Sequence, residues 1–276
     1  TYTHLLRVHR CMHTTGSSPH KAYQAESIDA PTPLVTGSRT HVANEQDYEA
    51  LRPFFAWMPS KIIKRTFLNS TQYGYLPQSP EGNLFKRYKS PQPGMNIFRL
   101  RDDVLMDEIF SSTPAIEGKF TSAMVFFGRK SHIIHVGHMT KTKCLLPCLQ
   151  NFVRQYGAPN RILADHTKYH EGFSVLSYLR MLWIKLWFSE AYYHHQNPFE
   201  RRYQTFKRIV NRLMDRTGTP PQLWFLCMQY VAYVLNRMSD PTLGNRQPIF
   251  RATGSIGDIS PLTCFSWLQP VYFKPH

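Results

Sequence analysis

The sequence predicts an α/β fold in which helices flank a mixed sheet of five strands. Two observations lead to this prediction. Segments 104–110, 121–127 and 132–139 have the apolar character of strands, and the sequence Gly-Arg-Lys-Ser between the last two is typical of a hairpin turn. From residue 145 onward, helical and strand patterns alternate, as they do in an α/β sheet. The length of 276 residues accommodates one substantial domain and a flanking segment.

The first helix after the hairpin is predicted from apolar residues that recur at positions i, i+4, i+7, i+8 and i+11. These residues are Leu145, Leu149, Phe152, Val153 and Tyr156. Gly157 ends this helix, and the apolar run 161–165 follows as the fourth strand. We expect residues 171–183 to form a mostly apolar helix and residues 185–189 to form the fifth strand.

Two more helices complete the predicted domain. A long basic helix begins at Asn197 or Pro198 and runs to Gly218, because proline is tolerated in a first turn, where its missing N–H would have no partner. Pro220 and Pro221 then open a largely apolar helix that ends near Met238.

The long helix has two different faces when it is projected at 100° per residue. Its apolar stripe consists of Tyr203, Phe206, Val210 and Leu213. Its polar face consists of Glu200, Gln204, Lys207 and Asn211. Arg208 is one of several further basic residues on this helix.

The chain is expected to have four parts. Residues 1–44 are rich in His, Thr, Ser and Pro without periodicity, which predicts a poorly ordered flank. Residues 45–96 contain short helical patterns and a proline-rich linker, residues 97–255 form the main domain, and residues 256–276 form a tail. Since the chain begins with Thr, we expect it to be a segment of a longer polyprotein or a gene fragment.

Composition narrows the class of protein. The formal net charge is +15, and from residue 97 onward there are 22 Lys and Arg against 12 Asp and Glu. A basic surface suits a polyanionic partner, although basic proteins are common. The five scattered cysteines argue against a disulfide framework and indicate a reducing compartment. The longest apolar run, 223–235, is too short to cross a bilayer, and no signal peptide is visible, so no membrane partner is expected.

Three carboxylates mark the candidate site. Asp107 lies in the first predicted strand, Asp165 ends the fourth, and Glu200 opens the long helix, at spacings of 58 and 35 residues. Carboxylates are hard oxygen ligands for Mg²⁺ or Mn²⁺. Two such ions can clamp the attacking and leaving oxygens of a phosphoryl displacement. Taken singly, each Asp reads as a turn or cap residue, but the joint pattern favours a two-ion site.

The local sequence resembles the integrase of copia-type LTR retrotransposons, whose catalytic core has a ribonuclease-H-like fold. The matching stretches are Asp-Glu-Ile-Phe-Ser-Ser-Thr-Pro-Ala-Ile (107–116), Ile-Leu-Ala-Asp (162–165), His-Gln-Asn-Pro-Phe-Glu-Arg-Arg-Tyr-Gln (195–204), Asp-Arg-Thr-Gly (215–218), Trp-Phe-Leu-Cys-Met-Gln-Tyr-Val-Ala-Tyr-Val-Leu-Asn (224–236) and Asp-Ile-Ser-Pro-Leu (258–262). The resemblance covers roughly residues 45–276 and is most specific at 195–218.

The resemblance implies an activity and its residues. Asp107, Asp165 and Glu200 would be the D,D-35-E triad that binds two Mg²⁺ or Mn²⁺ ions for DNA 3′-end processing and strand transfer. In this family the polar face of the Glu200 helix lies against the DNA end. We therefore expect double-stranded DNA, of the element ends and of the target, to contact Gln204, Lys207, Arg208 and Asn211. The resemblance also implies a homo-oligomer assembled on DNA, in the nucleus or, before integration, in a cytoplasmic particle.

Other interpretations of these residues stay open. Asp102, Asp103 and Glu108 lie near Asp107; strand alternation puts Glu108 on the opposite face, and we expect the other two to be solvated. His132, His135 and His138 are not expected to form a metal site, since alternation separates the middle one. Cys144 and Cys148 lack zinc-site partners at the right spacing and are expected to be buried thiols.

Two further functions remain as alternatives. One is a non-catalytic or domesticated DNA-binding relic that keeps the fold and the basic surface. The other is a generic nuclease of the same fold, since fold alone does not determine function.

Overall fold

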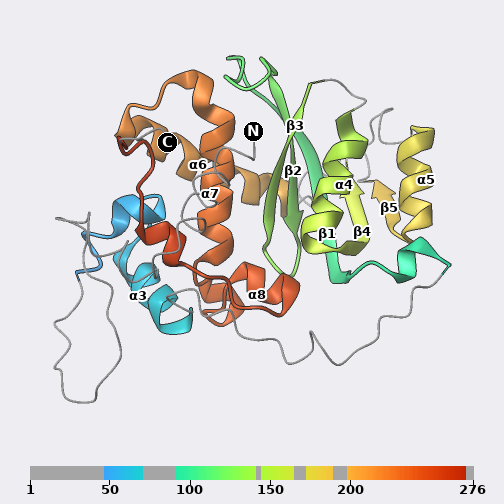
Figure 1. Ribbon diagram of the computed structural model, residues 1–276, viewed down its shortest axis with the longest axis horizontal. Coiled ribbons are helices and arrows are strands. Elements are labelled where there is room, and N and C mark those ends of the chain that lie inside the picture. The colour runs from blue at the N-terminus through green and yellow to red at the C-terminus, as the bar shows by residue number, and fades with distance from the viewer. Residues whose placement is uncertain (1–46, 71–90, 141–143, 165–171, 189–197, 272–276) are drawn as a thin grey trace, which may run out of the picture. The chain divides into compact units, whose positions relative to one another are not determined.

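A computed structural model describes residues 47–70, 91–140, 144–164, 172–188 and 198–271 (Figure 1). The expected flank 1–44 lies outside the described residues. The chain divides into two compact units, Thr1–Ala50 and Leu51–His276. In the described part of the first unit, Asp47 Oδ1 accepts a hydrogen bond from the backbone N–H of Glu49 (2.9 Å). All elements below belong to the second unit.

Five strands form one sheet in the order β3-β2-β1-β4-β5. They are β1 (Arg99–Phe110), β2 (Ser122–Gly128), β3 (Ile134–Met139), β4 (Ala158–Ala164) and β5 (Lys185–Phe188). The pairs β1–β2 and β2–β3 are antiparallel, whereas β1–β4 and β4–β5 are parallel. The prediction of a mixed five-stranded sheet accompanied by helices is confirmed. β1, which carries Asp107, is the central strand.

Six helices accompany the sheet in the described part of the chain. They are α3 (Ser60–Asn69), α4 (Leu145–Tyr156), α5 (Phe173–Met181), α6 (Pro198–Thr217), α7 (Trp224–Arg237) and α8 (Pro248–Thr253). Short 3-10 turns lie at Arg52–Phe55, Pro93–Met95, Pro221–Leu223, Pro241–Leu243 and Ser260–Thr263. Within the described segments, no helix is long and apolar enough to cross a lipid bilayer.

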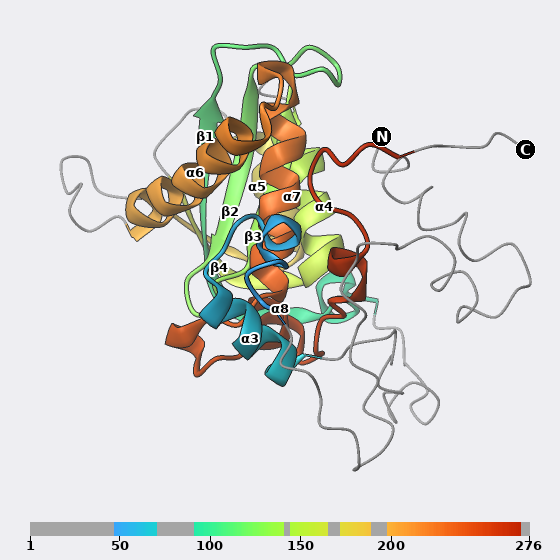
Figure 2. The same cartoon turned by 90° about the vertical axis from the view of Figure 1, so that its left-hand side faces the viewer.

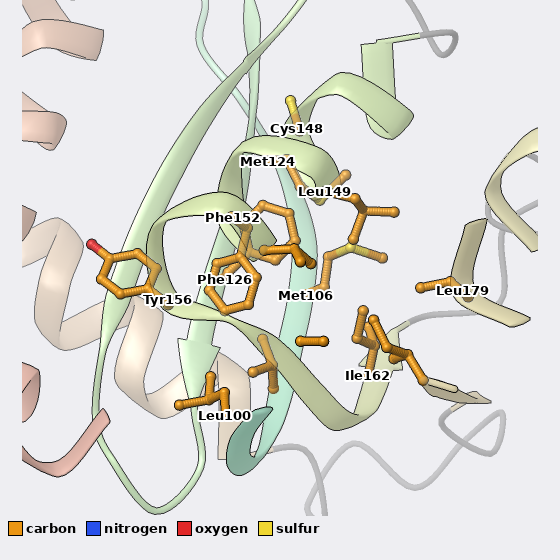
Figure 3. Packing of buried hydrophobic residues seen from close by; sticks show 14 of the residues in the cluster. Leu100, Met106, Met124, Phe126, Cys148, Leu149, Phe152, Tyr156, Ile162 and Leu179 are labelled. Atoms are coloured by element: carbon orange, nitrogen blue, oxygen red, sulfur yellow. The ribbon is translucent and has the colours of Figure 1, made fainter. Parts of the chain in front are cut away.

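The helix predicted from the apolar spacing forms at α4, and its buried side packs on one face of the sheet (Figure 3). Phe152 of α4 stacks on Phe126 of β2 with ring centroids 4.9 Å apart and planes at 18°. Gly157 ends the helix with φ at +96°, and a Cβ there would lie 2.6 Å from the carbonyl oxygen of Phe98. Glycine at this position therefore permits the tight passage from α4 into β4.

On the opposite face of the sheet, α6 packs over the central strands β1 and β2 and crosses them in Figure 2. The apolar stripe predicted for this helix faces the sheet and α7, since Phe206, Val210 and Leu213 are all buried. Phe206 meets Phe127 of β2 edge to face, with centroids 6.1 Å apart. Burying three large apolar side chains contributes roughly 1.5–3 kcal/mol each, so packing fixes which side of α6 remains exposed.

Residues 51–70 attach to α7 and the segment after it through buried polar contacts. The Tyr230 hydroxyl donates to the carbonyl of Phe54 (2.9 Å), and the Ser239 N–H donates to Thr66 Oγ1 (2.9 Å). These bonds join segments more than 170 residues apart in sequence.

The β2–β3 turn is held by Asp102, in contrast to the expectation that Asp102 and Asp103 are solvated. That expectation is wrong: both residues are buried, and Asp102 is only 3% exposed. The Asp102 carboxylate accepts hydrogen bonds from the N–H of Lys130 (2.9 Å) and from the N–H (2.8 Å) and hydroxyl (2.6 Å) of Ser131. Strand β1 begins earlier than the sequence predicts, at Arg99, which places both aspartates within the sheet.

Candidate active site and nucleic-acid interface

Asp107 lies near the end of the central strand, where it is half-buried. It pairs with Val125 of β2, and its Oδ1 accepts a hydrogen bond from the N–H of Glu108 (2.8 Å). Since successive side chains of a strand point to opposite faces, Glu108 points to the other face of the sheet from Asp107. A carboxylate at this place is carried by a strand that is hydrogen-bonded to a neighbour on each side.

Helix α6 packs against β1, the strand that carries Asp107. Tyr203 is half-buried, and its pKa is raised by burial and, in addition, by the negative charge of Asp107. Glu200 precedes Tyr203 by three residues, a spacing that places two side chains next to each other on a helix. Its carboxylate is exposed and accepts a hydrogen bond from Gln204 Nε2 (3.3 Å). The structure thus brings the segments that carry Asp107 and Glu200 together.

The third predicted carboxylate, Asp165, lies outside the described residues. The last described residue of β4, Ala164, pairs in parallel register with Met106. Ala164 is bonded to Asp165, and Met106 is bonded to Asp107. The described strands therefore lead the chain to equivalent points at the same end of the sheet.

The four residues predicted to contact DNA are exposed on α6. They are Gln204, Lys207, Arg208 and Asn211. Arg208 Nε donates to the backbone carbonyl of Gln204 (3.3 Å) along the helix. Because the apolar stripe of α6 is turned to the protein interior, these polar side chains are presented outward beside Glu200.

Arg202 fixes the first turn of α6 to the rest of the domain, a role that its sequence context did not indicate. Its guanidinium donates to the carbonyl of Gly128, and Nη2 donates to the carbonyl of Arg129 (3.0 Å). Burial lowers its pKa, while the charges of Asp102 and Asp240 oppose that effect. Arg202 therefore joins the helix of Glu200 to the β2–β3 turn.

Asp240 lies in the segment after α7 and belongs, with Asp102, to a cluster of charges around Arg202. Burial opposes its ionisation, yet hydrogen bonds from His132 and Thr242 lower the pKa of Asp240 to about 2. The His132 ring nitrogen Nδ1 lies 2.6 Å from Asp240 Oδ2. We conclude that the cluster stabilises the turn and holds Arg202 in place.

His135, Cys144 and Cys148 differ in burial, which shifts the pKa values of His135 and Cys148. Among the residues that the structure describes, no group of three or more His, Cys, Asp or Glu side chains is arranged to hold a metal ion. His135 is buried against Phe126 and Phe152, and burial lowers its pKa to about 4, so the ring is neutral at pH 7. Cys148 is a buried thiol as expected, with a pKa raised by burial to about 12, whereas Cys144 is half-buried rather than buried.

Comparisons with known proteins give structural matches only. No protein-family description matches the sequence, and no curated protein matches it. A chain of the simian T-cell lymphotropic virus intasome, in complex with a PP2A regulatory subunit, is 12% identical with a TM-score of 0.44. The match covers 65% of this chain and 62% of that one, so the chain spans less than two thirds of the viral chain.

Two integrase catalytic core domains also match. The core domain of HTLV-2 integrase, in complex with magnesium, is 14% identical with a TM-score of 0.40, over 51% of this chain and 88% of that one. The core domain of BIV integrase is 13% identical with a TM-score of 0.44, over 55% of this chain and 94% of that one.

Proposed function

We propose that this chain is an integrase-type polynucleotidyl transferase of a copia-type LTR retrotransposon, which processes DNA 3′ ends and joins them to target DNA. One observation supports this proposal above all: α6, which carries Glu200 in its first turn, packs against β1, the central strand that carries half-buried Asp107. Residues 97–255 would form the catalytic core, acting as a homo-oligomer on DNA in the nucleus.

The donor chemistry fits a divalent cation. Asp107 and Glu200 supply carboxylate oxygens, which Mg²⁺ and Mn²⁺ prefer, and Asp165 follows the strand that pairs beside Asp107. Two such ions, held by these carboxylates, would supply activation of the attacking water or 3′-hydroxyl and would stabilise charge on the phosphate. The three carboxylates would hold them from separate elements, and the strand and helix would keep the donors in position.

The side chains of α6 would bind the DNA substrate by charge and hold it in position. Lys207 and Arg208 would bind phosphates of the terminal duplex, and Gln204 and Asn211 would contact the backbone or terminal bases beside Glu200. Phosphate contacts of this kind fix the register of DNA without reading its sequence. They would align the scissile phosphate with the carboxylates, whichever nucleophile attacks.

The first test is an oligonucleotide strand-transfer assay with Mn²⁺. We expect the wild-type chain to produce joined product and the Asp165→Asn variant to produce none above background, because one oxygen donor is replaced by a neutral amide. If the two chains behave identically, the alternative of a non-catalytic DNA-binding relic is correct. Cleavage without joining in the wild-type chain would instead support a generic nuclease.

The second test concerns the DNA-binding face of α6. In a titration of a terminal DNA duplex at several salt concentrations, Lys207→Ala should lower affinity and reduce the slope of log K against log salt by about 1, since one phosphate contact releases about 0.9 counterion. Lys61→Ala, an exposed lysine on α3, serves as the matched control and should leave the slope unchanged. Equal slopes for wild type and Lys207→Ala would count against the assigned face.

A further inference from the structure

The exposed side of the parallel edge of the sheet carries a distinct set of residues. Arg161 and Leu163 alternate with buried residues along β4, and Lys185 and Trp187 alternate with half-buried residues along β5. Arg161 pairs with Lys185 and Leu163 pairs with Trp187 in register, so the four side chains share one face. We call these four residues the edge strip. β5 is the last strand of the sheet, next to β4 (Figure 1).

Trp187 gives the edge strip an exposed aromatic ring. It is 59% exposed, although an indole ring normally lies largely inside a protein. The guanidinium of Arg161 lies over this ring, with Cζ 5.9 Å from the ring centroid. Arg161 is itself fixed by Asp103, to which Nε (3.1 Å) and Nη2 (2.7 Å) donate, and this bonding raises its pKa. The aromatic ring is thus backed by a cation that β1 holds in place.

The edge strip leads directly to the candidate active site. Leu163 pairs with Leu105 of β1, and Asp107 follows Leu105 by two residues on the same face. At about 3.3 Å per residue, two residues correspond to roughly 7 Å along a strand. A linear ligand that extends along β4 and β5 would therefore pass within reach of the carboxylates.

We propose that the edge strip binds an unpaired nucleic-acid strand, with one base stacked on Trp187 and a phosphate near Lys185. Every base has a flat π-face, and stacking on an exposed aromatic residue of a sheet is a general way to hold unpaired bases. Bases inside a duplex already stack on each other, so an internal duplex segment cannot use this ring. Arg161 positions the Trp187 ring and is not expected to bind a phosphate, because Asp103 already neutralises its charge.

This inference rests on the proposed function in one respect only, which is the source of the bound strand. That strand would be the unpaired end of a DNA undergoing processing. Binding itself requires no metal ion and no reaction. The edge strip can therefore be tested with a chelator present, separately from catalysis.

The experiment measures fluorescence anisotropy of a labelled oligothymidine of about 12 nucleotides with the full chain in EDTA. Trp187→Leu should weaken binding about tenfold, which corresponds to about 1.4 kcal/mol, within the range of one stacked base. Trp187→Phe, which keeps an aromatic face, should remain within about threefold of wild type. A blunt duplex of the same length should bind all three chains equally.

Trp183→Leu is the matched control, because Trp183 is 68% exposed and lies just before β5. It should leave single-strand affinity unchanged. The proposal is overturned if Trp187→Leu binds as wild type does, if Trp187→Phe loses as much as Trp187→Leu, or if Trp183→Leu loses as much. An active enzyme with an unaltered Trp187→Leu titration would refute the edge strip alone, whereas an inactive chain that shows the expected losses would refute only the transferase.

Discussion

Asp107→Asn is expected to lower Mn²⁺-dependent strand transfer on the order of a thousandfold, equivalent to about 4 kcal/mol of transition-state stabilisation. The amide has the size of the carboxylate but carries no negative charge, and it binds a hard cation weakly. Asp107 lies on the central strand, against which α6 packs, so its carboxylate is held in place by the sheet. Initial rates of product formation on a pre-processed DNA end would measure the loss.

Glu108→Gln provides the matched control for this loss. Glu108 is the next residue of β1 and is also half-buried, but strand alternation turns it to the other face of the sheet. We expect its activity to stay within about threefold of wild type, since no transition-state contact is removed. Equal losses for the two variants would mean that general negative charge, rather than a defined donor, supports the reaction.

Asp102→Ala is expected to destabilise the domain by about 3–5 kcal/mol, the range for a buried charged partner that is removed. The substitution leaves the N–H groups of Lys130 and Ser131 and the Ser131 hydroxyl without their acceptor. Each unsatisfied buried donor costs about 1–3 kcal/mol. It also removes a negative charge that opposes the desolvation of Arg202. Urea unfolding at pH 7 would measure this cost as a lower midpoint.

Asp103→Ala tests whether the cost is specific to the turn. Asp103 is the neighbouring residue and makes a two-point contact with Arg161, but the Arg161 side chain is 41% exposed and can be solvated when its partner is lost. We expect a cost of about 1 kcal/mol or less, as for pairs open to water. If Asp102→Ala folds too poorly to titrate, Asp102→Asn should give an intermediate cost, because the amide keeps one acceptor oxygen. Similar midpoints for Asp102→Ala and Asp103→Ala would contradict the role of the turn.

The sequence predicted the elements well because their signals are local. The spacing of Leu145, Leu149 and Phe152 predicts α4, and Gly157 marks its end, as the structure confirms. The apolar stripe of α6 likewise follows from the period of the helix, so the exposed side of that helix was predictable before any packing was known. The site prediction depended on the joint pattern of Asp107, Asp165 and Glu200 and on a resemblance rather than on periodicity, and the roles of all three residues stay predictions.

The charged contacts could not be predicted, because they join residues distant in sequence. Asp102 and Asp103 look like solvated residues at the start of a strand, but their partners lie 28 to 58 residues away. In the sequence, Arg202 is one of several basic residues on its helix. Only the folded structure shows that two carbonyls of the β2–β3 turn accept hydrogen bonds from it. Trp187 lies in a short strand whose edge position is set only by the assembled sheet.

The link between Arg202 and the β2–β3 turn restricts which sequence changes the domain can tolerate. Gly128 and Arg129 hold the guanidinium two residues after Glu200, and a Cβ on Gly128 would lie 2.1 Å from Ser131 Oγ. An insertion in this hairpin would shift both carbonyls. The start of α6 would then either move with them or lose its hydrogen bonds to them. Related chains should therefore conserve the length of a loop that contains none of the reacting groups.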